Sequence, residues 1–153
     1  MSLGSAMQIS ASGLTAERLR LDVISNNLAN VDTTRGPNGQ PYRREIVTLA
    51  ERQPGGDSFH AMLIALRGGP EDEAPGAGVE VTSIQPDYST PYKVIHDPGN
   101  PDADANGNVR MPNVNPIIEM VDMISASRAY EADVTAINAA KQMQTRAIDI
   151  GRA

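Results

Sequence analysis

The sequence predicts an α+β fold in which long N- and C-terminal helices pack as a coiled-coil-like pair, with a small β-rich and extended insert between them in the chain. Apolar residues near both ends of the chain follow alternating steps of three and four, which is the spacing of helices that pack along a partner helix. The middle of the chain has no helical period and holds most of the 13 glycines and 11 prolines. We therefore expect three parts: residues 1–34, 35–114 and 115–153.

The N-terminal helix is expected over residues 3–31. Its apolar residues recur every seven positions, with others at the complementary spacing, so one side of the helix should pack along a partner. The turn-forming residues 32–39 then end the helix. On this helix we expect the assembly interface to include Met7, Leu14, Leu21, Ile24 and Leu28.

The insert should contain short strands. Residues 42–49 and 59–66 read as two strands of a hairpin with a long loop, and residues 79–84 read as a third strand with alternating apolar and polar side chains. Residues 85–116 are interrupted by prolines and are expected to be extended.

The C-terminal helix is expected over residues 115–151. Asn115 can cap the first turn, Pro116 suits the first helical position, and Gly151 is a candidate left-handed stop. About 35 residues at 1.5 Å each give a rod of roughly 50 Å. Its first eight residues, 117–124, are mostly apolar and should be covered on more than one face. The expected interface residues on this helix are Met120, Met123, Tyr130, Val134, Ile137 and Ile148.

Composition excludes several functional classes. The formal charge of −6 and the isoelectric point near 4.8 argue against a nucleic-acid or anionic-membrane surface. The chain has no apolar run long enough for a membrane span, no ordinary secretory signal and no cysteine for disulfide or thiolate chemistry. With one Phe, four Tyr and no Trp, an isolated monomer should be hard to stabilise, so we expect neighbouring subunits to complete the core.

One segment resembles a calcium-binding loop. Residues 102–109 match the first eight positions of such a loop, with Asp102, Asp104 and Gly107 in place. The twelfth position is Asn113, where a bidentate Glu is needed, and nearby prolines deny the loop its flanking helices. We therefore expect a turn in which carboxylates bind their own backbone, with no metal and no cofactor.

A hydrolase is the other chemical alternative. Ser89, His96 and Asp97 supply the residue types of a catalytic triad. Nothing in the sequence places the serine on a sharp turn or supplies an oxyanion site, so we expect no catalytic residues and no enzymatic activity.

Two stretches carry a family resemblance. Residues 26–34, Asn-Asn-Leu-Ala-Asn-Val-Asp-Thr-Thr, resemble the motif that closes the N-terminal helix in axial proteins of the bacterial flagellum. Residues 96–98, 101–109, 111–115 and 119–132 look like the FlgC family of flagellar proximal-rod proteins, although Asn108 stands where that family often has an aromatic residue. The family-motif residues are Asn27, Ala29, Asn30, Thr33, Pro101, Asp102, Asp104, Gly107, Pro112 and Asn113.

The resemblance implies a structural subunit of the proximal rod that assembles helically through its terminal helices and transmits motor torque to the hook. It implies a basal-body location in the periplasm, reached through the flagellar type III export apparatus without a cleavable signal peptide. The implied partners are other proximal-rod proteins, the rod-base adaptor and further copies of the chain. The alternatives are another flagellar axial subunit and, more remotely, a calcium-binding helical adaptor.

Overall fold

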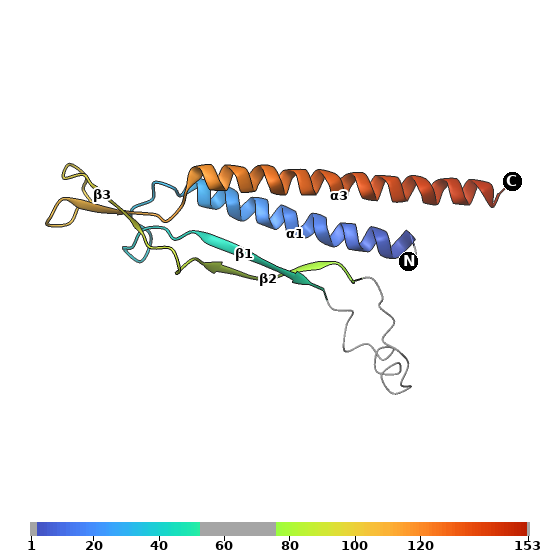
Figure 1. Cartoon of the computed structure of the whole chain (residues 1–153), viewed down its shortest axis with the longest axis horizontal. Helices are drawn as coiled ribbons and strands as arrows, with labels where there is room; N and C mark the ends of the chain where they lie inside the picture. Colours follow the sequence, from blue (N-terminus) through green and yellow to red (C-terminus); the bar gives the residue numbers. More distant parts are fainter. Residues whose placement is uncertain (1–2, 53–75, 153) are drawn as a thin grey trace, which may run out of the picture. The chain divides into compact units, whose positions relative to one another are not determined.

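The computed structural model describes residues 3–52 and 76–152. Two long helices, α1 (Leu3–Ala29) and α3 (Pro116–Ile150), begin and end the described chain, and four strands lie between them in the sequence (Figure 1). The strands are β1 (Glu45–Glu51), β2 (Val79–Pro86), β3 (Lys93–His96) and β4 (Asn108–Met111). The α+β class is therefore confirmed. No helix in the described parts of the chain is long and apolar enough to cross a membrane.

The chain divides into two compact units, and each takes a segment of both helices. The first unit comprises Met1–Glu17, Leu49–Thr82 and Ala129–Ala153, and the second comprises Arg18–Thr48 and Ser83–Arg128. The expected division into residues 1–34, 35–114 and 115–153 is a different one, and it stays a prediction.

In the first unit, the start of α1 lies against the C-terminal half of α3 and against β2. The carboxylate of Asp133 on α3 lies so close to Gly13 that a β-carbon at that position would collide with it. Ser12 Oγ donates to the Ile9 carbonyl at 2.6 Å and accepts from the Val79 N–H at 3.0 Å, which fastens β2 to α1. Short side chains on this face of α1 therefore allow close packing.

In the second unit, the end of α1 lies antiparallel to the start of α3. Asn27 contacts Glu119, and Arg20, which lies seven residues earlier on α1, forms an ion pair of 4.0 Å with Asp122 on α3. Because the α1 partner moves toward the N-terminus as the α3 partner moves toward the C-terminus, the helices run in opposite directions. Apolar residues buried in this unit are Val23, Ile24, Val109, Val114 and Ala126.

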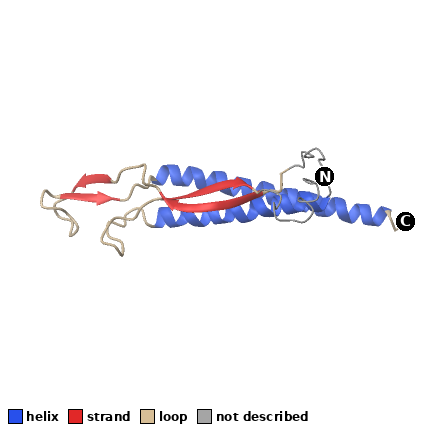
Figure 2. Cartoon of the chain, turned by 90° about the horizontal axis from the view of Figure 1, so that it is seen from below, coloured by secondary structure: helices blue, strands red, loops and turns tan. Residues whose placement is uncertain are grey.

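The strands form two separate two-stranded sheets, β1 with β2 and β3 with β4 (Figure 2). The Asp87 N–H donates to the Arg44 carbonyl at one end of the first pair, and the Arg52 N–H donates to the Gly78 carbonyl at the other, which makes that pair antiparallel. The expected strands at 42–49 and 79–84 correspond to β1 and β2. The expected strand at 59–66 lies outside the described residues.

Residues 85–116 were expected only to be extended, and the structure forms a hairpin there that the sequence did not predict. β3 and β4 pair antiparallel from Lys93 opposite Met111 to His96 opposite Asn108. The turn between them is held by local hydrogen bonds and by Gly107, whose φ of +77° suits a residue without a β-carbon. The prolines at 98, 101 and 112 lie outside both strands, so they do not interrupt the pairing.

The start of α3 follows the prediction and its end does not. Asn115 Oδ1 accepts the Ile117 N–H at 3.1 Å, which is the expected cap, and Pro116 is the first helical residue. The left-handed stop at Gly151 was wrong: among the described residues, positive φ occurs only at Gly39, Gly78 and Gly107. Gly151 instead donates its N–H to the Ala147 carbonyl at 3.1 Å, which continues the helical pattern.

Candidate assembly site and the junction that supports it

Asn27 connects three segments of the second unit. Its side chain is 1% exposed. The Nδ2 group donates to the Glu45 carbonyl at 2.9 Å and to Glu119 Oε2 at 3.1 Å, while Oδ1 accepts the Glu45 N–H and the Tyr42 hydroxyl, each at 2.9 Å. A buried amide with all of these partners joins the end of α1 to β1 and to α3.

Glu119 is the charged counterpart of Asn27 on α3. It is fully buried, and Arg44 Nε donates to its Oε1 at 2.5 Å. Arg44 also reaches Asp122 at 3.3 Å, so one guanidinium contacts two carboxylates on the first turns of α3. A buried carboxylate needs such a partner, because an unpaired charge away from water is costly.

Tyr42 lies beside this charged group. Its hydroxyl donates to Asn27 Oδ1 and accepts from Asn26 Nδ2 at 3.3 Å. Burial raises the pKa of Tyr42 to about 12, and the nearby carboxylates of Glu45 and Glu119 act in the same direction. The tyrosine is therefore held in its neutral form, and its hydroxyl donates a hydrogen bond to the amide oxygen of Asn27.

The rest of the first family-motif stretch closes α1. Asn30 Nδ2 donates to the Asn26 carbonyl at 2.9 Å, and Asn30 Oδ1 accepts the Thr33 hydroxyl at 3.1 Å. The Thr33 carbonyl accepts the Tyr42 N–H at 3.0 Å, which brings the chain back toward β1. Ala29 is the last residue of α1 and is exposed.

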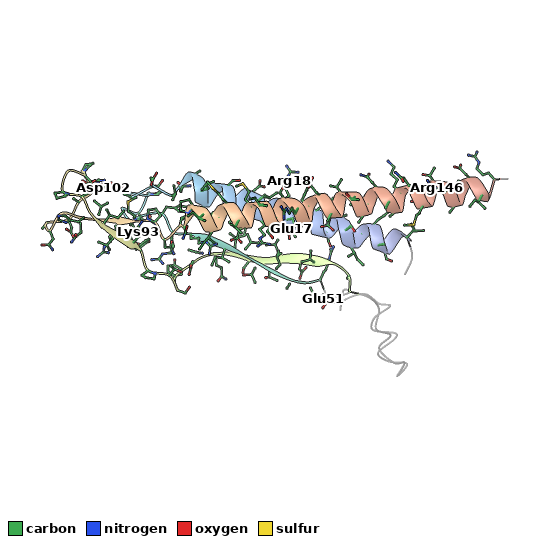
Figure 3. All side chains as sticks on the ribbon, turned by 45° about the horizontal axis from the view of Figure 1, so that its top comes forward. Glu17, Arg18, Glu51, Lys93, Asp102 and Arg146 are labelled. Carbon is green, nitrogen blue, oxygen red and sulfur yellow. The ribbon has the colours of Figure 1, made fainter. Side chains whose placement is uncertain are left out.

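The second motif stretch holds the loops of the same unit. Asp102, labelled in Figure 3, accepts the Thr34 hydroxyl at 2.7 Å and contacts Arg35 at 3.4 Å. Asn113 accepts the Arg44 N–H at 2.8 Å and donates to the carbonyls of Asp87 and Thr90. Pro112 is buried beside it, whereas Pro101 is exposed.

Arg43 and Arg44 serve opposite sides of the chain where it enters β1. Arg44 faces α3, whereas the Arg43 guanidinium lies 4.2 Å from the ring centre of Tyr92 and 4.8 Å from that of Tyr88. Arg43 also donates to the Asp87 carbonyl at 2.7 Å. These contacts could not be derived from the sequence, because the partners are 44 to 78 residues away.

Asp87 closes a turn beside Arg43. The hydroxyl groups of Ser89 and Thr90 donate to its carboxylate at 2.5 and 2.7 Å and hold the pKa of Asp87 well below its usual range. Ser89 is thus engaged in a turn, and His96 instead contacts Asn108 at 3.2 Å. The hypothetical triad residues Ser89 and His96 therefore have separate local partners.

The acidic segment forms the expected turn. Asp104 Oδ1 accepts the backbone N–H groups of Asn108 and Asn106 at 2.9 and 2.8 Å, which lowers the pKa of Asp104. The adjoining cavity of about 410 Å³ is lined in part by Arg35, Asp102 and Arg110. Within residues 3–52 and 76–152, no group of three His, Asp or Glu side chains is arranged to hold a metal ion.

The predicted interface residues differ in exposure within the single chain. On α1, Ile24 is buried, and Met7, Leu14, Leu21 and Leu28 are half-buried. On α3, Met123, Val134 and Ile137 are half-buried, whereas Met120, Tyr130 and Ile148 are exposed. The participation of these eleven residues in assembly stays a prediction.

The residues that α3 buries within the chain coincide only in part with the seam, the row of apolar residues predicted to form the interface. Its buried members include Glu119, Ala126 and Ala140, none of which is a predicted interface residue, and Glu119 directly precedes Met120. The intervening positions Met123 and Ile137 are shared by both patterns. The predicted seam therefore includes only some of the residues that α3 buries within the chain.

The first turns of α3 carry an apolar surface that the single chain leaves open. Five large apolar side chains are each more than half exposed: Ile117, Ile118, Met120, Val121 and Ile124. The last turns, residues 141–150, are exposed at every position, and the labelled Arg146 projects from them (Figure 3). The expected cover for the start of this helix is therefore absent from the described chain, and contiguous apolar exposure of this kind marks protein–protein contact sites.

Two family descriptions match the ends of the chain. Residues 7–37 match a family described as flagella basal body rod protein. Residues 105–150 match one described as flagellar basal body rod FlgEFG protein C-terminal.

Several curated proteins are similar over the full length. A flagellar basal-body rod protein FlgC of Bacillus subtilis is 46% identical, covering 96% of this chain and 97% of that protein. The FlgC protein of Borreliella burgdorferi is 47% identical, covering 98% of each chain. That of Salmonella typhimurium is 39% identical, covering 99% of this chain and all of the relative.

Proposed function

The chain belongs to the FlgC family of flagellar basal-body rod proteins, and we propose that this structural rod subunit assembles helically through its terminal helices into the proximal rod. In that role it transmits motor torque to the hook. The observation that carries the proposal is the open apolar surface at the start of α3, where five large side chains face solvent.

The same surface supports association with further rod subunits. An isolated chain that leaves Ile117, Val121 and Ile124 exposed gains stability when a neighbour covers them. The neighbours we propose are other copies of the chain, other proximal-rod proteins and the rod-base adaptor. The side-chain network around Asn27 then has a supporting role, because it fixes the helix that presents the surface.

We further propose a periplasmic location in the basal body, reached through the flagellar type III export apparatus without a cleavable signal peptide. Coupling the burial of the apolar surface to assembly would restrict polymerisation to the growing tip, where partner helices are present. We propose no enzymatic activity, since the polar side chains of the candidate triad and of the acidic turn are already used in local hydrogen bonds.

A substitution at Val121 tests the assembly surface. Val121 is 61% exposed, so Val121→Asp should leave the fold intact while placing a charge at the contact. We expect cells that carry only this variant to lose swimming, and purified basal bodies to lack the chain. Val121→Thr, which has a similar shape and no charge, should retain both. Normal swimming by the Val121→Asp strain, with the purified variant as helical as the wild type by circular dichroism, would refute the proposed surface.

A further inference from the structure

The apolar pattern of α1 does not by itself fix how α1 aligns with α3. Met7, Leu14, Leu21 and Leu28 repeat every seven residues. If α1 slid by seven residues along α3, three of these four side chains would take the place of a similar one. Seams of this type commonly need polar residues to select a single register.

The first unit contains one contact that depends on the register. Gly13 lies in the interior of α1, where glycine weakens a helix relative to alanine. The carboxylate of Asp133 occupies the space that a β-carbon of residue 13 would need. The glycine therefore provides a site on α1 into which the acidic side chain fits.

The second unit contains another such contact. Asn27 and Glu119 are both buried and are joined by a hydrogen bond of 3.1 Å. Arg44, which follows α1 in the chain, neutralises the carboxylate. In another alignment Glu119 would be a buried carboxylate without Asn27 and Arg44, which would strongly destabilise the chain. This contact therefore favours the observed alignment.

The two contacts have the same spacing on both helices. Gly13 and Asn27 are 14 residues apart, and so are Glu119 and Asp133, which equals two heptads and agrees with one antiparallel register. We propose that these two pairs, the register contacts, select the alignment of α1 with α3. A slide of seven residues one way would place Asn27 against Ala126, and the other way would carry it past the start of α3.

The inference concerns the single chain and does not depend on the proposed rod function. Its consequence for assembly is that the register decides which residues of α3 stay exposed. The same device accounts for the buried carboxylate of Glu119 and for the position of Asp133 beside Gly13.

The absence of cysteine allows a direct test with paired cysteines. In the observed register, Ile9→Cys should lie opposite Ile137→Cys, and after a slide of seven residues it should lie opposite Gln144→Cys. The probe is a short bifunctional thiol reagent, applied to dilute protein and followed by mass spectrometry of the monomer. In the otherwise unchanged chain, we expect the Ile9–Ile137 pair to crosslink at least tenfold faster than the Ile9–Gln144 pair.

A variant of identical composition moves the acidic residues by one heptad: Glu119→Ala, Ala126→Glu, Asp133→Ala and Ala140→Asp together. We expect its preference to reverse, so that the Ile9–Gln144 pair crosslinks faster. A preserved tenfold preference for Ile9–Ile137, with unchanged helicity by circular dichroism, would overturn the proposal.

If the fourfold variant does not fold, a variant with two substitutions tests whether these contacts select the register. Gly13→Ala with Asp133→Ala removes one register contact and improves helix propensity, so the helices should remain. We expect the preference for the Ile9–Ile137 pair to fall at least threefold. An unchanged preference would show that the register is set elsewhere.

Discussion

At the residue scale, the buried amide of Asn27 stabilises the second unit through its hydrogen bonds. Both N–H bonds and the oxygen have partners on three different segments. Leucine at the same position would leave the Glu45 backbone groups and the Glu119 carboxylate without this partner. The identity of this residue therefore reflects satisfied hydrogen bonds in a closed site, not the burial of apolar area.

Replacing Asn27 should destabilise the second unit. Asn27→Ala removes one hydrogen-bond partner each from the Glu119 carboxylate, the Tyr42 hydroxyl and the Glu45 backbone, and we expect a loss of about 2–4 kcal/mol of unfolding free energy. Urea denaturation followed by circular dichroism measures this loss. The matched control is Asn138→Ala at an exposed position of α3, which should change stability by less than about 0.5 kcal/mol. Equal effects of the two substitutions would contradict the role given to Asn27.

Tyr42 predicts a pH dependence at alkaline pH. Its folded pKa is raised to about 12 from 10.0, so the folded chain keeps a proton that the unfolded chain releases. The stability that this group contributes is fully present below pH 10 and is lost as the pH rises toward 12. In an ultraviolet absorbance titration, Tyr42→Phe should remove a transition centred near pH 12. Removal of a transition centred near pH 10 would mean that the hydroxyl is not held in its neutral form.

At the scale of elements, the helices were predictable and half of the strand pattern was not. Heptad spacing, Asn115 and Pro116 are local signals, and α1 and α3 follow them closely. The β3–β4 hairpin was missed because its strands have only four residues each, and prolines nearby suggested extended chain. Its stability comes from turn hydrogen bonds and a left-handed glycine, which a search for strand periodicity does not detect.

The seam of α3 shows a second limit of sequence reasoning. Apolar spacing selected Met120, although the adjacent Glu119 is the buried residue. A pattern of hydrophobicity cannot anticipate a buried carboxylate, because its partner Arg44 is 75 residues away in the chain. Only the folded arrangement of α1, β1 and α3 brings the pair together.

The β3–β4 turn should depend on Gly107. With φ at +77° and a β-carbon that would lie 3.0 Å from both His96 and Pro98, Gly107→Ala is strained and crowded. We expect it to cost about 1–3 kcal/mol, seen as faster hydrogen exchange in peptides covering residues 93–111. Gly99→Ala is the control, because its nearest contact for a β-carbon is 3.6 Å away. Unchanged exchange in the Gly107→Ala chain would disprove the importance of this turn.

Charges placed in the helix seams should prevent assembly. Leu21 and Ile137 are half-buried within the chain, so Leu21→Asp or Ile137→Asp disturbs the packing of α1 and α3 as well as any intersubunit contact. We expect either variant to be expressed and to be absent from purified basal bodies, with loss of swimming. Normal swimming by either strain would count against the packing role of the seams.

At the scale of the whole molecule, the sequence located the motif residues only through family resemblance. Asn27, Asp102 and Asn113 are far apart in the chain, yet all belong to the second unit, where each joins separate segments. Composition argues against nucleic-acid binding, and the absence of cysteine excludes thiol chemistry. The partners of each motif residue could not be derived, because they depend on contacts between distant parts of the chain.

The small apolar core and the exposed start of α3 both indicate that the single chain lacks part of its stabilising contacts. The chain has few aromatic residues, and its fully buried apolar side chains in the described parts are few and mostly small. A subunit of this composition is expected to gain a large part of its final stability from neighbours. Under the proposed function, the same helix surfaces stabilise the folded monomer and contact its neighbours in the rod.

The most direct test of the central claim is quantitative mass spectrometry of hook–basal bodies purified from the bacterium that encodes this chain. If the chain is a structural rod subunit, it should remain after stringent washing at an abundance near that of the other proximal-rod proteins. Its absence from a preparation that retains the rest of the rod would contradict the account.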